Sequence, residues 1–334
     1  MDGGQGIARR RCAFARLKTK ISNRQSYQGT GTDMQTSEMT AKIAGGKGFI
    51  AALDQSGGST PKALAGYGIE AAAWADEAGM YGLIHDMRSR IIGSPAFTGD
   101  KVIGAILFER TMDGQVGGKP TPQALIEKGV VPFLKIDKGL EEEADGVQMM
   151  KPMPGLDALL ARAKQLGVFG TKERSVINLA NKDGIAAIVS QQFVVGDQVA
   201  AHGLVPMLEP EINIKSAERA AADLILRDEL LAALDDDVNG PKFMLKLSIP
   251  AVAGTFDALV DHPRVLRVVA LSGGFSRADA CVELAKNRGM IASFSRALLS
   301  DLRHQMSDAE FDSSLGEAID EIYTASTQKS AVPA

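Results

Sequence analysis

From Gly48 onward, short apolar runs rich in β-branched residues alternate with longer segments whose apolar residues recur at helical spacing. Eight of the short runs fit buried parallel strands, which are covered on both faces and therefore read as nearly continuous apolar stretches. They lie at residues 49–56, 102–109, 130–137, 168–177, 204–212, 242–249, 265–272 and 290–294. Strands that alternate with helices form parallel sheets with right-handed crossovers. Eight such units predict an α/β protein with a closed (β/α)8 TIM barrel.

Helix signals support this division of the chain. Ser307 and Glu310 form a capping-box pattern, and Ser276 precedes another helical segment. Gly129 follows a helical segment, where glycine often ends a helix. The stretch from residue 57 to residue 101 is longer than one crossover, so we expect it to contain two helices, one of them over residues 71–92.

Composition limits the function classes. Of the 334 residues, 45% are hydrophobic and 23% charged, which is ordinary for a globular protein. The net charge of −4 provides no general attraction for nucleic acid or membranes, and no apolar run is long enough to span a bilayer. The only cysteines, Cys12 and Cys281, rule out a disulfide framework and favour a reducing compartment, so we expect a cytoplasmic protein. The four histidines are scattered along the chain, which argues against a zinc site.

The start of the chain differs from the rest. The first 33 residues contain seven basic residues and two acidic ones. This pattern fits a flexible extension and also an organellar transit peptide, so import into an organelle stays open. We expect a flexible basic N-terminal extension over residues 1–40, a single barrel domain over residues 41–327 and a flexible C-terminal tail over residues 328–334.

Lys246 interrupts an otherwise apolar strand, the run 242–249. An ammonium group there must be paired, reach solvent or be kept neutral for chemistry. Lowering a lysine pKa by about three units would make the amine a nucleophile near neutral pH, at a cost of about 4 kcal/mol. Such lysines form Schiff bases with carbonyl substrates. A buried lysine–carboxylate pair and a lysine that reaches solvent from a strand end are the structural alternatives.

Ionisable residues stand near the carboxyl ends of other predicted strands, where barrel enzymes place their active sites. Side chains alternate faces with a period of two, so residues two positions apart share one face. By this rule Asp54 and Ser56 share one face, as do Lys135 and Asp137, and Glu209 and Glu211. Lys172 and Arg174 are the ionisable residues of the fourth predicted strand. Ionisable groups near one end of five strands, Lys246 included, are hard to explain by packing alone, and we expect them to line the lumen.

Two segments at strand ends fit phosphate binding. Ser272, Gly273 and Gly274 follow the seventh predicted strand, and Ser295 and Arg296 open a helix after the eighth. Many barrels bind phosphate with the loops after strands seven and eight and a helix N-terminus, and an arginine can contact two phosphate oxygens.

The second segment runs from Ser56 to Ser59, with Lys135 expected near it across the barrel. Two such segments suggest a substrate with a phosphate at each end, although a Gly-Gly pair by itself is more often a plain turn.

Eight motifs together resemble the class I, Schiff-base fructose-1,6-bisphosphate aldolases in their shorter bacterial form. They are GFIAALDQSGGSTPKAL (48–64), GAILFERTMD (104–113), KGVVPFLKIDKGL (128–140), FGTKERS (169–175), GLVPMLEPEINI (203–214), FMLKLSIP (243–250), RVVALSGGFSR (267–277) and IASFSRALLSDL (291–302). They lie within residues 42–327, keep the barrel order and are specific as a set. The resemblance implies a lyase of glycolysis and gluconeogenesis, without metal or cofactor. Its reaction is the reversible cleavage of fructose 1,6-bisphosphate to dihydroxyacetone phosphate and glyceraldehyde 3-phosphate.

The resemblance also implies catalytic roles for individual residues. Lys246 would be the Schiff-base nucleophile, and Glu209 the acid/base for carbinolamine dehydration and proton transfer. Lys172 would be the cation that depresses the pKa of the nucleophile. Asp54 would take the proton from the hydroxyl on carbon 4, and Glu211 would tune Glu209 and Lys246.

Phosphate-binding roles follow in the same way. The resemblance assigns the phosphate nearer the ketone to Ser272, Gly273 and Arg296, while Gly274 and Ser295 are phosphate-binding candidates from the same two segments. It assigns the distal phosphate to Ser56, Ser59 and Lys135. The expected partner is therefore a small phosphosugar, with homo-oligomerisation left open.

The chain also departs from the longer animal-type enzymes of the family. Its tail after Tyr323 contains no aromatic residue, and the motif that contains Arg296 is two residues shorter. Gln55 stands where those enzymes have an acid. Two alternatives remain at this point: a Schiff-base aldolase or transaldolase for another phosphosugar, and a non-catalytic phosphosugar-binding barrel.

Overall fold

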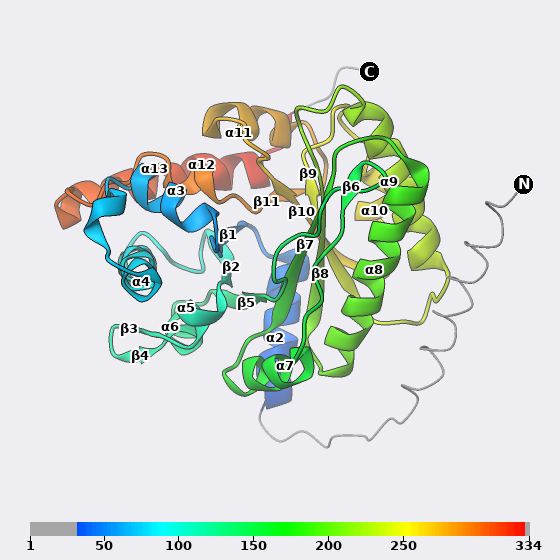
Figure 1. Ribbon diagram of the computed structural model, residues 1–334. Helices are drawn as coiled ribbons and strands as arrows, with labels where there is room; N and C mark the ends of the chain where they lie inside the picture. The colour runs from blue at the N-terminus through cyan, green and yellow to red at the C-terminus, as the bar shows by residue number, and fades with distance from the viewer. Residues whose placement is uncertain (1–31, 331–334) are drawn as a thin grey trace, which may run out of the picture. The chain divides into compact units, whose positions relative to one another are not determined.

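The computed structural model describes residues 32–330, and its central feature is an eight-stranded parallel barrel (Figure 1). Around the ring the strands follow chain order: β1 (Phe49–Leu53), β2 (Val102–Leu107), β5 (Val131–Lys135), β7 (Gly170–Ile177), β8 (Val205–Ile212), β9 (Phe243–Ser248), β10 (Val265–Leu271) and β11 (Ile291–Ala292). Each neighbouring pair in this order is parallel. The ring closes where the Ala52 N–H donates to the Phe294 carbonyl oxygen at 3.1 Å, beside β11. The predicted (β/α)8 barrel is confirmed.

Helices connect these strands. They are α2 (Thr32–Gly45), α3 (Ser59–Gly66), α4 (Glu77–Gly93), α5 (Glu109–Met112), α6 (Thr121–Glu127), α7 (Leu156–Gln165), α8 (Lys182–Ala201), α9 (Arg219–Asp235), α10 (Asp257–Val260), α11 (Arg277–Ala285), α12 (Arg296–Leu299) and α13 (Asp308–Thr327). Short elements complete the set: η1 (Ala71–Ala73), β3 (Gln115–Val116), β4 (Lys119–Pro120) and β6 (Val147–Gln148). Helices α8 and α9 lie side by side against β8 (Figure 1). None of the helices in the described part of the chain has the length and apolar character that a membrane span requires.

All eight predicted strands are present, with shorter bounds than the apolar runs suggest. The predicted second strand was too long, because β2 ends at Leu107 and Glu109 begins α5. Glu109 forms ion pairs with Lys138 and Arg162 on the surface, at 2.8 Å and 2.5 Å. These pairs give Glu109 a structural role outside the lumen.

The helix expected over residues 71–92 is interrupted. Residues Ala71–Ala73 form the short 3-10 helix η1, and α4 begins only at Glu77. The side chain of Asp76 accepts a hydrogen bond from the Gly79 N–H at 2.8 Å, which satisfies a donor that the first turn leaves free. The prediction missed this cap because the apolar periodicity continues across it.

Two apolar layers hold the barrel, and both follow from the alternation of side chains along each strand. The inner layer contains Ile50, Ala52, Ile103, Ile106, Val131, Phe133, Phe169, Met207, Met244, Leu266, Val269 and Ile291. On β1, Ala51 and Leu53 belong instead to the outer layer beneath the helices. Because the alternation continues past Leu53, Asp54 faces inward, directly above the apolar filling.

Gly170 on β7 lies close to the backbone of β8 and to the Phe133 ring, which leaves no room for a side chain. Phe133 and Phe169 meet edge to face with centroids 5.5 Å apart. At Gly170, a Cβ atom would lie 2.3 Å from the Val205 carbonyl oxygen and 3.0 Å from the Phe133 ring. Glycine at this position therefore allows β7 to pair closely with its neighbours around a large aromatic residue.

Helix α2 belongs to the barrel at its C-terminal end. Ile43 is fully buried in the inner apolar cluster, and Met39 packs against the same cluster. Arg267 on β10 donates to the Ala44 carbonyl oxygen at 2.7 Å. The contacts of the barrel thus include residues before the predicted domain start at 41. Residues 1–31 of the predicted extension lie outside the described residues, and its flexibility stays a prediction.

The C-terminal segment also has contacts beyond the predicted domain end at 327. The Lys329 ammonium donates to the carbonyl oxygens of Leu284, Met290 and Ala325, at 3.2, 2.6 and 2.9 Å. The Ser330 N–H donates to the Ala285 carbonyl oxygen. Residues 328–330 are therefore tied to α11 and to the start of β11, while residues 331–334 lie outside the described part of the chain.

Asp223 on α9 connects that helix to the loop after β9. It is 1% exposed, and its Oδ2 accepts the Ala251 N–H at 2.8 Å. Burial raises the pKa of Asp223 to about 6, and the Ala251 hydrogen bond and Arg219 only partly offset this effect. Between its ordinary pKa of 3.8 and about 6, the folded chain holds a proton here that the unfolded chain releases. This group therefore lowers the free energy of unfolding as pH rises through that window.

Asp223→Asn should remove this pH dependence, because the amide keeps an acceptor for Ala251 and cannot ionise. We expect the difference in free energy of unfolding between variant and wild type to be about 3 kcal/mol more favourable to the variant at pH 8 than at pH 4. Urea unfolding at both pH values measures it. Asp228→Asn, at an exposed position of the same helix, is the control. Equal differences at both pH values would contradict the assignment.

Candidate active site

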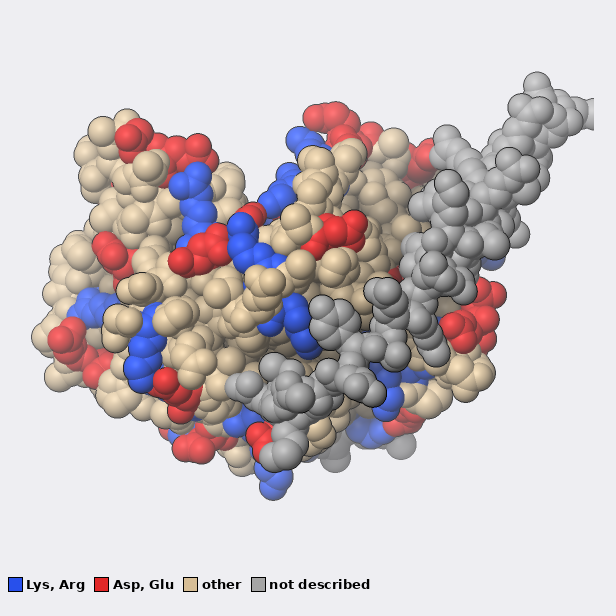
Figure 2. All heavy atoms as spheres, turned by 90° about the horizontal axis from the view of Figure 1, so that it is seen from below, with Lys and Arg blue, Asp and Glu red and all other residues tan. Residues whose placement is uncertain are grey.

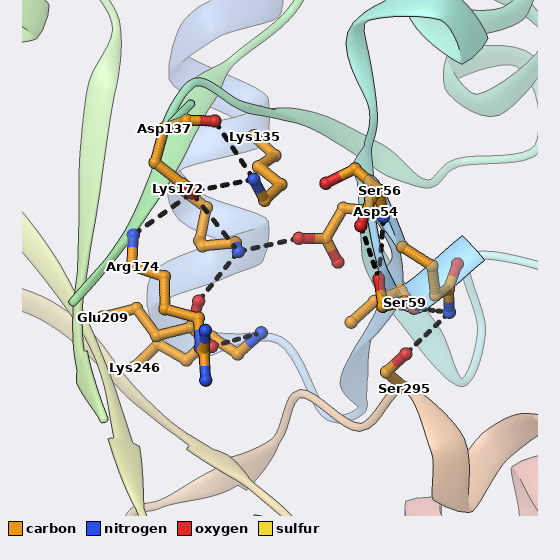
Figure 3. Close-up of polar contacts among 12 residues, drawn as sticks. Asp54, Ser56, Ser59, Lys135, Asp137, Lys172, Arg174, Glu209, Lys246 and Ser295 are labelled. Carbon is orange, nitrogen blue, oxygen red and sulfur yellow. Dashed lines mark hydrogen bonds and ion pairs between the residues drawn. The ribbon is translucent and has the colours of Figure 1, made fainter. Parts of the chain in front are cut away.

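Six charged side chains meet inside the barrel near the carboxyl ends of its strands (Figure 3). They are Asp54 after β1, Lys135 at the end of β5, Asp137 just beyond it, Lys172 on β7, Glu209 on β8 and Lys246 on β9. Each of these side chains is at most 12% exposed. A buried charge is costly unless it is paired, and here three lysines face three carboxylates. The predicted gathering of ionisable groups in the lumen is what the structure contains.

Lys172 lies at the centre of the cluster. Its Nζ is 2.7 Å from Asp54 Oδ2, 2.8 Å from Glu209 Oε2 and 3.9 Å from Asp137 Oδ2. Burial by itself would lower the pKa of Lys172, but the three carboxylates outweigh it and raise that pKa. Lys172 therefore stays protonated at neutral pH.

Glu209 links Lys172 to Lys246. Its second oxygen, Oε1, lies 3.0 Å from Lys246 Nζ (Figure 3). Burial by itself would raise the pKa of Glu209, but Lys172 and Lys246 together lower it. Glu209 is therefore ionised and within hydrogen-bond distance of the Lys246 nitrogen, where it can take up or deliver a proton.

Asp54 is held in the same way from the other side of Lys172. Burial acts to raise its pKa, while Lys172, Lys246 and Lys135 together lower it to well below the usual range. An ionised carboxylate at this depth can accept a proton from a hydroxyl group of a bound ligand.

Two further ion pairs border the cluster. Lys135 Nζ lies 2.6 Å from Asp137 Oδ1, and the Arg174 N–H donates to Asp137 Oδ2 at 3.3 Å. The Arg174 side chain ion-pairs with Glu211. Glu211, which we expected to act on Glu209 and Lys246, therefore has Arg174 as its direct partner. Arg174 in turn contributes to the lowered pKa of Glu209.

The loop after β10 forms a tight turn next to the Arg296 side chain. Gly273 and Gly274 have φ angles of +60° and +118°, in the region that favours glycine. A Cβ atom at Gly274 would lie 3.4 Å from an Arg296 guanidinium nitrogen. Ser272, which begins this turn, is buried. The structure thus brings together the loop after β10 and the arginine after β11, as the sequence predicts.

The loop after β1 forms a closed turn of its own. The Ser56 N–H donates to Ser59 Oγ at 2.9 Å, and the Ser59 hydroxyl donates to the Ser56 carbonyl oxygen at 2.8 Å. Ser295, which follows β11, is joined to this loop because its Oγ accepts a hydrogen bond from Gln55 Nε2 at 2.6 Å. All the predicted phosphate-binding residues therefore lie near the carboxyl ends of β1, β5, β10 and β11, with Lys135 ending β5, and Ser59 and Arg296 beginning α3 and α12.

The sequence analysis did not assign roles to three residues that the site contains. The period-two spacing placed Asp137 beside Lys135 on the lumen side without giving it a role, and Arg174 stands at the same spacing from Lys172. Arg88, on α4, contacts Gln55 from outside the ring. Its spacing of four residues from both Ile84 and Ile92 indicates the buried face of α4, although it does not indicate Gln55 as its partner.

Among residues 32–330 there is no group of three or more His, Cys, Asp or Glu residues arranged to hold a metal ion. The expectation of a reaction without metal or cofactor stays a prediction.

Comparison with known families decides what kind of protein this is. The family model described as fructose-bisphosphate aldolase class I matches residues 35–246, more than half of the chain. The chain belongs to this family. The matched region includes Asp54, Lys172, Glu209 and Lys246, and membership of the class I aldolases implies a lyase. The shorter bacterial form stays a prediction.

Two solved structures share the fold of this class I aldolase. The first is the fructose-bisphosphate aldolase of Plasmodium falciparum, crystallised with TRAP and a small-molecule inhibitor. It has a TM-score of 0.74 and 19% sequence identity, and the match covers 92% of this chain and 98% of that chain. The second, Cgl0159 of Corynebacterium glutamicum, has a TM-score of 0.50 and 14% identity over 90% of this chain and 99% of that one.

Lys172→Met should destabilise the aldolase strongly at neutral pH, because two buried carboxylates lose their shared cation. We expect a loss of about 3–5 kcal/mol in the free energy of unfolding at pH 7. The loss should shrink toward pH 4, because the buried carboxylates that lose Lys172 can take up a proton there and are then no longer unpaired charges.

Urea unfolding at the two pH values measures both effects. Lys101→Met is the control, since Lys101 forms an exposed pair with Asp320 that contributes at most about 1 kcal/mol. A loss that is small, or that is independent of pH, would contradict the electrostatic account of the cluster.

Proposed function

We propose that this chain is a fructose-1,6-bisphosphate aldolase that cleaves its substrate to dihydroxyacetone phosphate and glyceraldehyde 3-phosphate, and reverses the reaction, through a Schiff base on Lys246. The observation that carries the proposal is the buried series Lys246, Glu209, Lys172 and Asp54, with contacts of 3.0, 2.8 and 2.7 Å. In this proposal Lys246 is the nucleophilic amine and Glu209 the proton carrier. Lys172 is the cation and Asp54 the second base.

The first half of the reaction uses Lys246 and Glu209. Glu209 first takes one proton from Lys246 Nζ, and the resulting neutral amine adds to the ketone carbon of the substrate. A proton shifts from the nitrogen to the former ketone oxygen, which gives a neutral carbinolamine. Glu209 then gives the proton it took from Lys246 to the carbinolamine hydroxyl, which leaves as water. The product is a protonated imine, whose positive nitrogen can accept electrons from the neighbouring carbon.

The second half uses Asp54. Its carboxylate takes the proton from the hydroxyl on carbon 4, the bond between carbons 3 and 4 breaks, and its electron pair moves into the imine to form an enamine. Glyceraldehyde 3-phosphate leaves as the aldehyde. Protonation of carbon 3 and addition of one water release dihydroxyacetone phosphate and restore Lys246. Lys172 stabilises Asp54 and Glu209 as carboxylates between these steps.

Local groups, and not the general surface, account for phosphate binding in this proposal. On the face drawn in Figure 2, basic and acidic side chains are interspersed. Ser272 to Gly274, Ser295 and Arg296 hold the phosphate nearer the ketone. Ser56, Ser59 and Lys135 hold the distal phosphate, with Lys135 supplying a positive charge at the rim of the charged cluster.

Reduction with borohydride in the presence of dihydroxyacetone phosphate should attach the substrate covalently to Lys246, because borohydride reduces an imine to a stable amine. Peptide mass spectrometry should find the adduct on Lys246 and lose it in Lys246→Met, together with the aldolase activity. Lys329 is an internal control, since burial lowers its pKa to about 8 but its ammonium lies at the opposite end of the strands. An adduct on Lys329, or none, would overturn the proposed mechanism.

Lys135→Met should weaken selection for the second phosphate. We expect kcat/KM for fructose 1,6-bisphosphate to fall by about 10- to 100-fold, the range for a lost contact to a charged group, with much less change for fructose 1-phosphate. Steady-state kinetics with both sugars measure it. Lys138→Met, which removes a surface pair with Glu109, is the matched control. An equal loss with both sugars would argue against a distal phosphate at Lys135.

A further inference from the structure

Arg88 on α4 is a fully buried cation outside the catalytic cluster. It is 0% exposed, and among residues 32–330 no carboxylate lies within ion-pair distance of it. Its guanidinium donates to Thr111 Oγ1 at 2.7 Å, to the Gln55 carbonyl oxygen and to Gln55 Oε1 at 3.2 Å. Burial lowers the pKa of Arg88 to about 10, while Asp54 acts to raise it, so the group is charged at neutral pH. A buried charge without a carboxylate partner needs another explanation than ion pairing.

Gln55 connects Arg88 to the candidate site, because it forms hydrogen bonds with both Arg88 and Ser295. Gln55 lies between Asp54 and Ser56 and is itself buried. Arginine has only donors, so the amide oxygen of Gln55 must face Arg88. The amide nitrogen therefore faces the other way, where it donates to the Ala52 carbonyl oxygen at 3.2 Å and to Ser295 Oγ at 2.6 Å.

This arrangement sets the direction of the Ser295 hydroxyl. Because Ser295 Oγ accepts from Gln55, its own hydrogen points elsewhere, and it has no acceptor among the described residues. Arg88 therefore donates to Gln55, and Gln55 donates to Ser295. The Ser295 O–H is the last donor and has no acceptor among the described residues. Such a group, polarised by a buried cation, suits an anion as its acceptor.

We propose that Arg88 and Gln55 are positioning residues that hold the Ser295 hydroxyl as a hydrogen-bond donor to the phosphate nearer the ketone. This inference rests on the proposed function, since it needs a phosphate at that place. Gln55 fits the task because it accepts on one side and donates on the other. A carboxylate at this position would accept from both, and Ser295 would have to turn its hydrogen away from the ligand.

Gln55→Glu separates this role from a purely structural one, because the two make opposite predictions. The introduced carboxylate pairs with Arg88, so the thermal midpoint should stay the same or rise. Affinity for dihydroxyacetone phosphate and for inorganic phosphate should fall by at least about tenfold, as expected for one lost hydrogen bond to a charged group. The effect should fall mainly on KM, with kcat for fructose 1,6-bisphosphate changed by less than about threefold.

A double-mutant cycle with Ser295→Ala tests whether Gln55 acts through that hydroxyl. If it does, Gln55→Glu should have little further effect on phosphate affinity in the Ser295→Ala background. Gln123→Glu, at an exposed position of α6, is the matched control and should bind like wild type.

The outcomes distinguish this inference from the function on which it rests. Wild type that fails to bind dihydroxyacetone phosphate overturns the proposed function. Wild type that binds it, with Gln55→Glu binding equally well, overturns the role of Gln55. A lower thermal midpoint with additive losses in the cycle also overturns it, since that result assigns Gln55 to folding alone.

Discussion

The site depends on charge balance at one depth inside the barrel. Lys172 contacts Asp54 and Glu209, Glu209 contacts Lys246, and Lys135 with Asp137 completes a set of three lysines and three carboxylates. In a low-dielectric interior a charge on any of these groups would be costly without its partners, so the groups hold one another in place. The chemistry proposed for Lys246 follows from this arrangement, because the nitrogen is within reach of an ionised proton carrier and Asp54 is ionised across the lumen.

The apolar half of the barrel makes this layer of charges possible. Inward residues below it, such as Ala52 and Phe133, fill the lumen, and Ile43 of α2 adds to the same cluster. Asp54, Glu209 and Lys246 each lie two residues beyond an apolar residue of the inner cluster, and so continue its period-two positions. Strands are more precise supports than loops, and Lys172, Glu209 and Lys246 all lie within strands. The groups proposed to bind phosphate lie near the carboxyl ends of the strands, in the loops after them or at the first residues of the following helices.

The sequence predicts this fold and most of the site because both depend on local patterns. Apolar runs indicate the strands, and polar residues that break the runs at one end indicate the lumen. The partners of individual side chains are a different matter, because they depend on contacts between distant parts of the chain. The helical spacing of α4 places Arg88 on the buried face, four residues from Ile84 and Ile92, but it does not show that the partner of Arg88 is Gln55. The pairing of Glu211 with Arg174, and of Gln55 with Ser295 across 240 positions, likewise needs the folded barrel.

A crystal structure of the borohydride-reduced complex with dihydroxyacetone phosphate tests the central claim most directly. The account predicts continuous density from Lys246 Nζ to the former ketone carbon, with the Glu209 carboxylate within hydrogen-bond distance of that nitrogen. It also predicts the phosphate against Ser272, Gly273 and Arg296. A ligand attached to another lysine, or a phosphate bound away from the loops after β10 and β11, would contradict it.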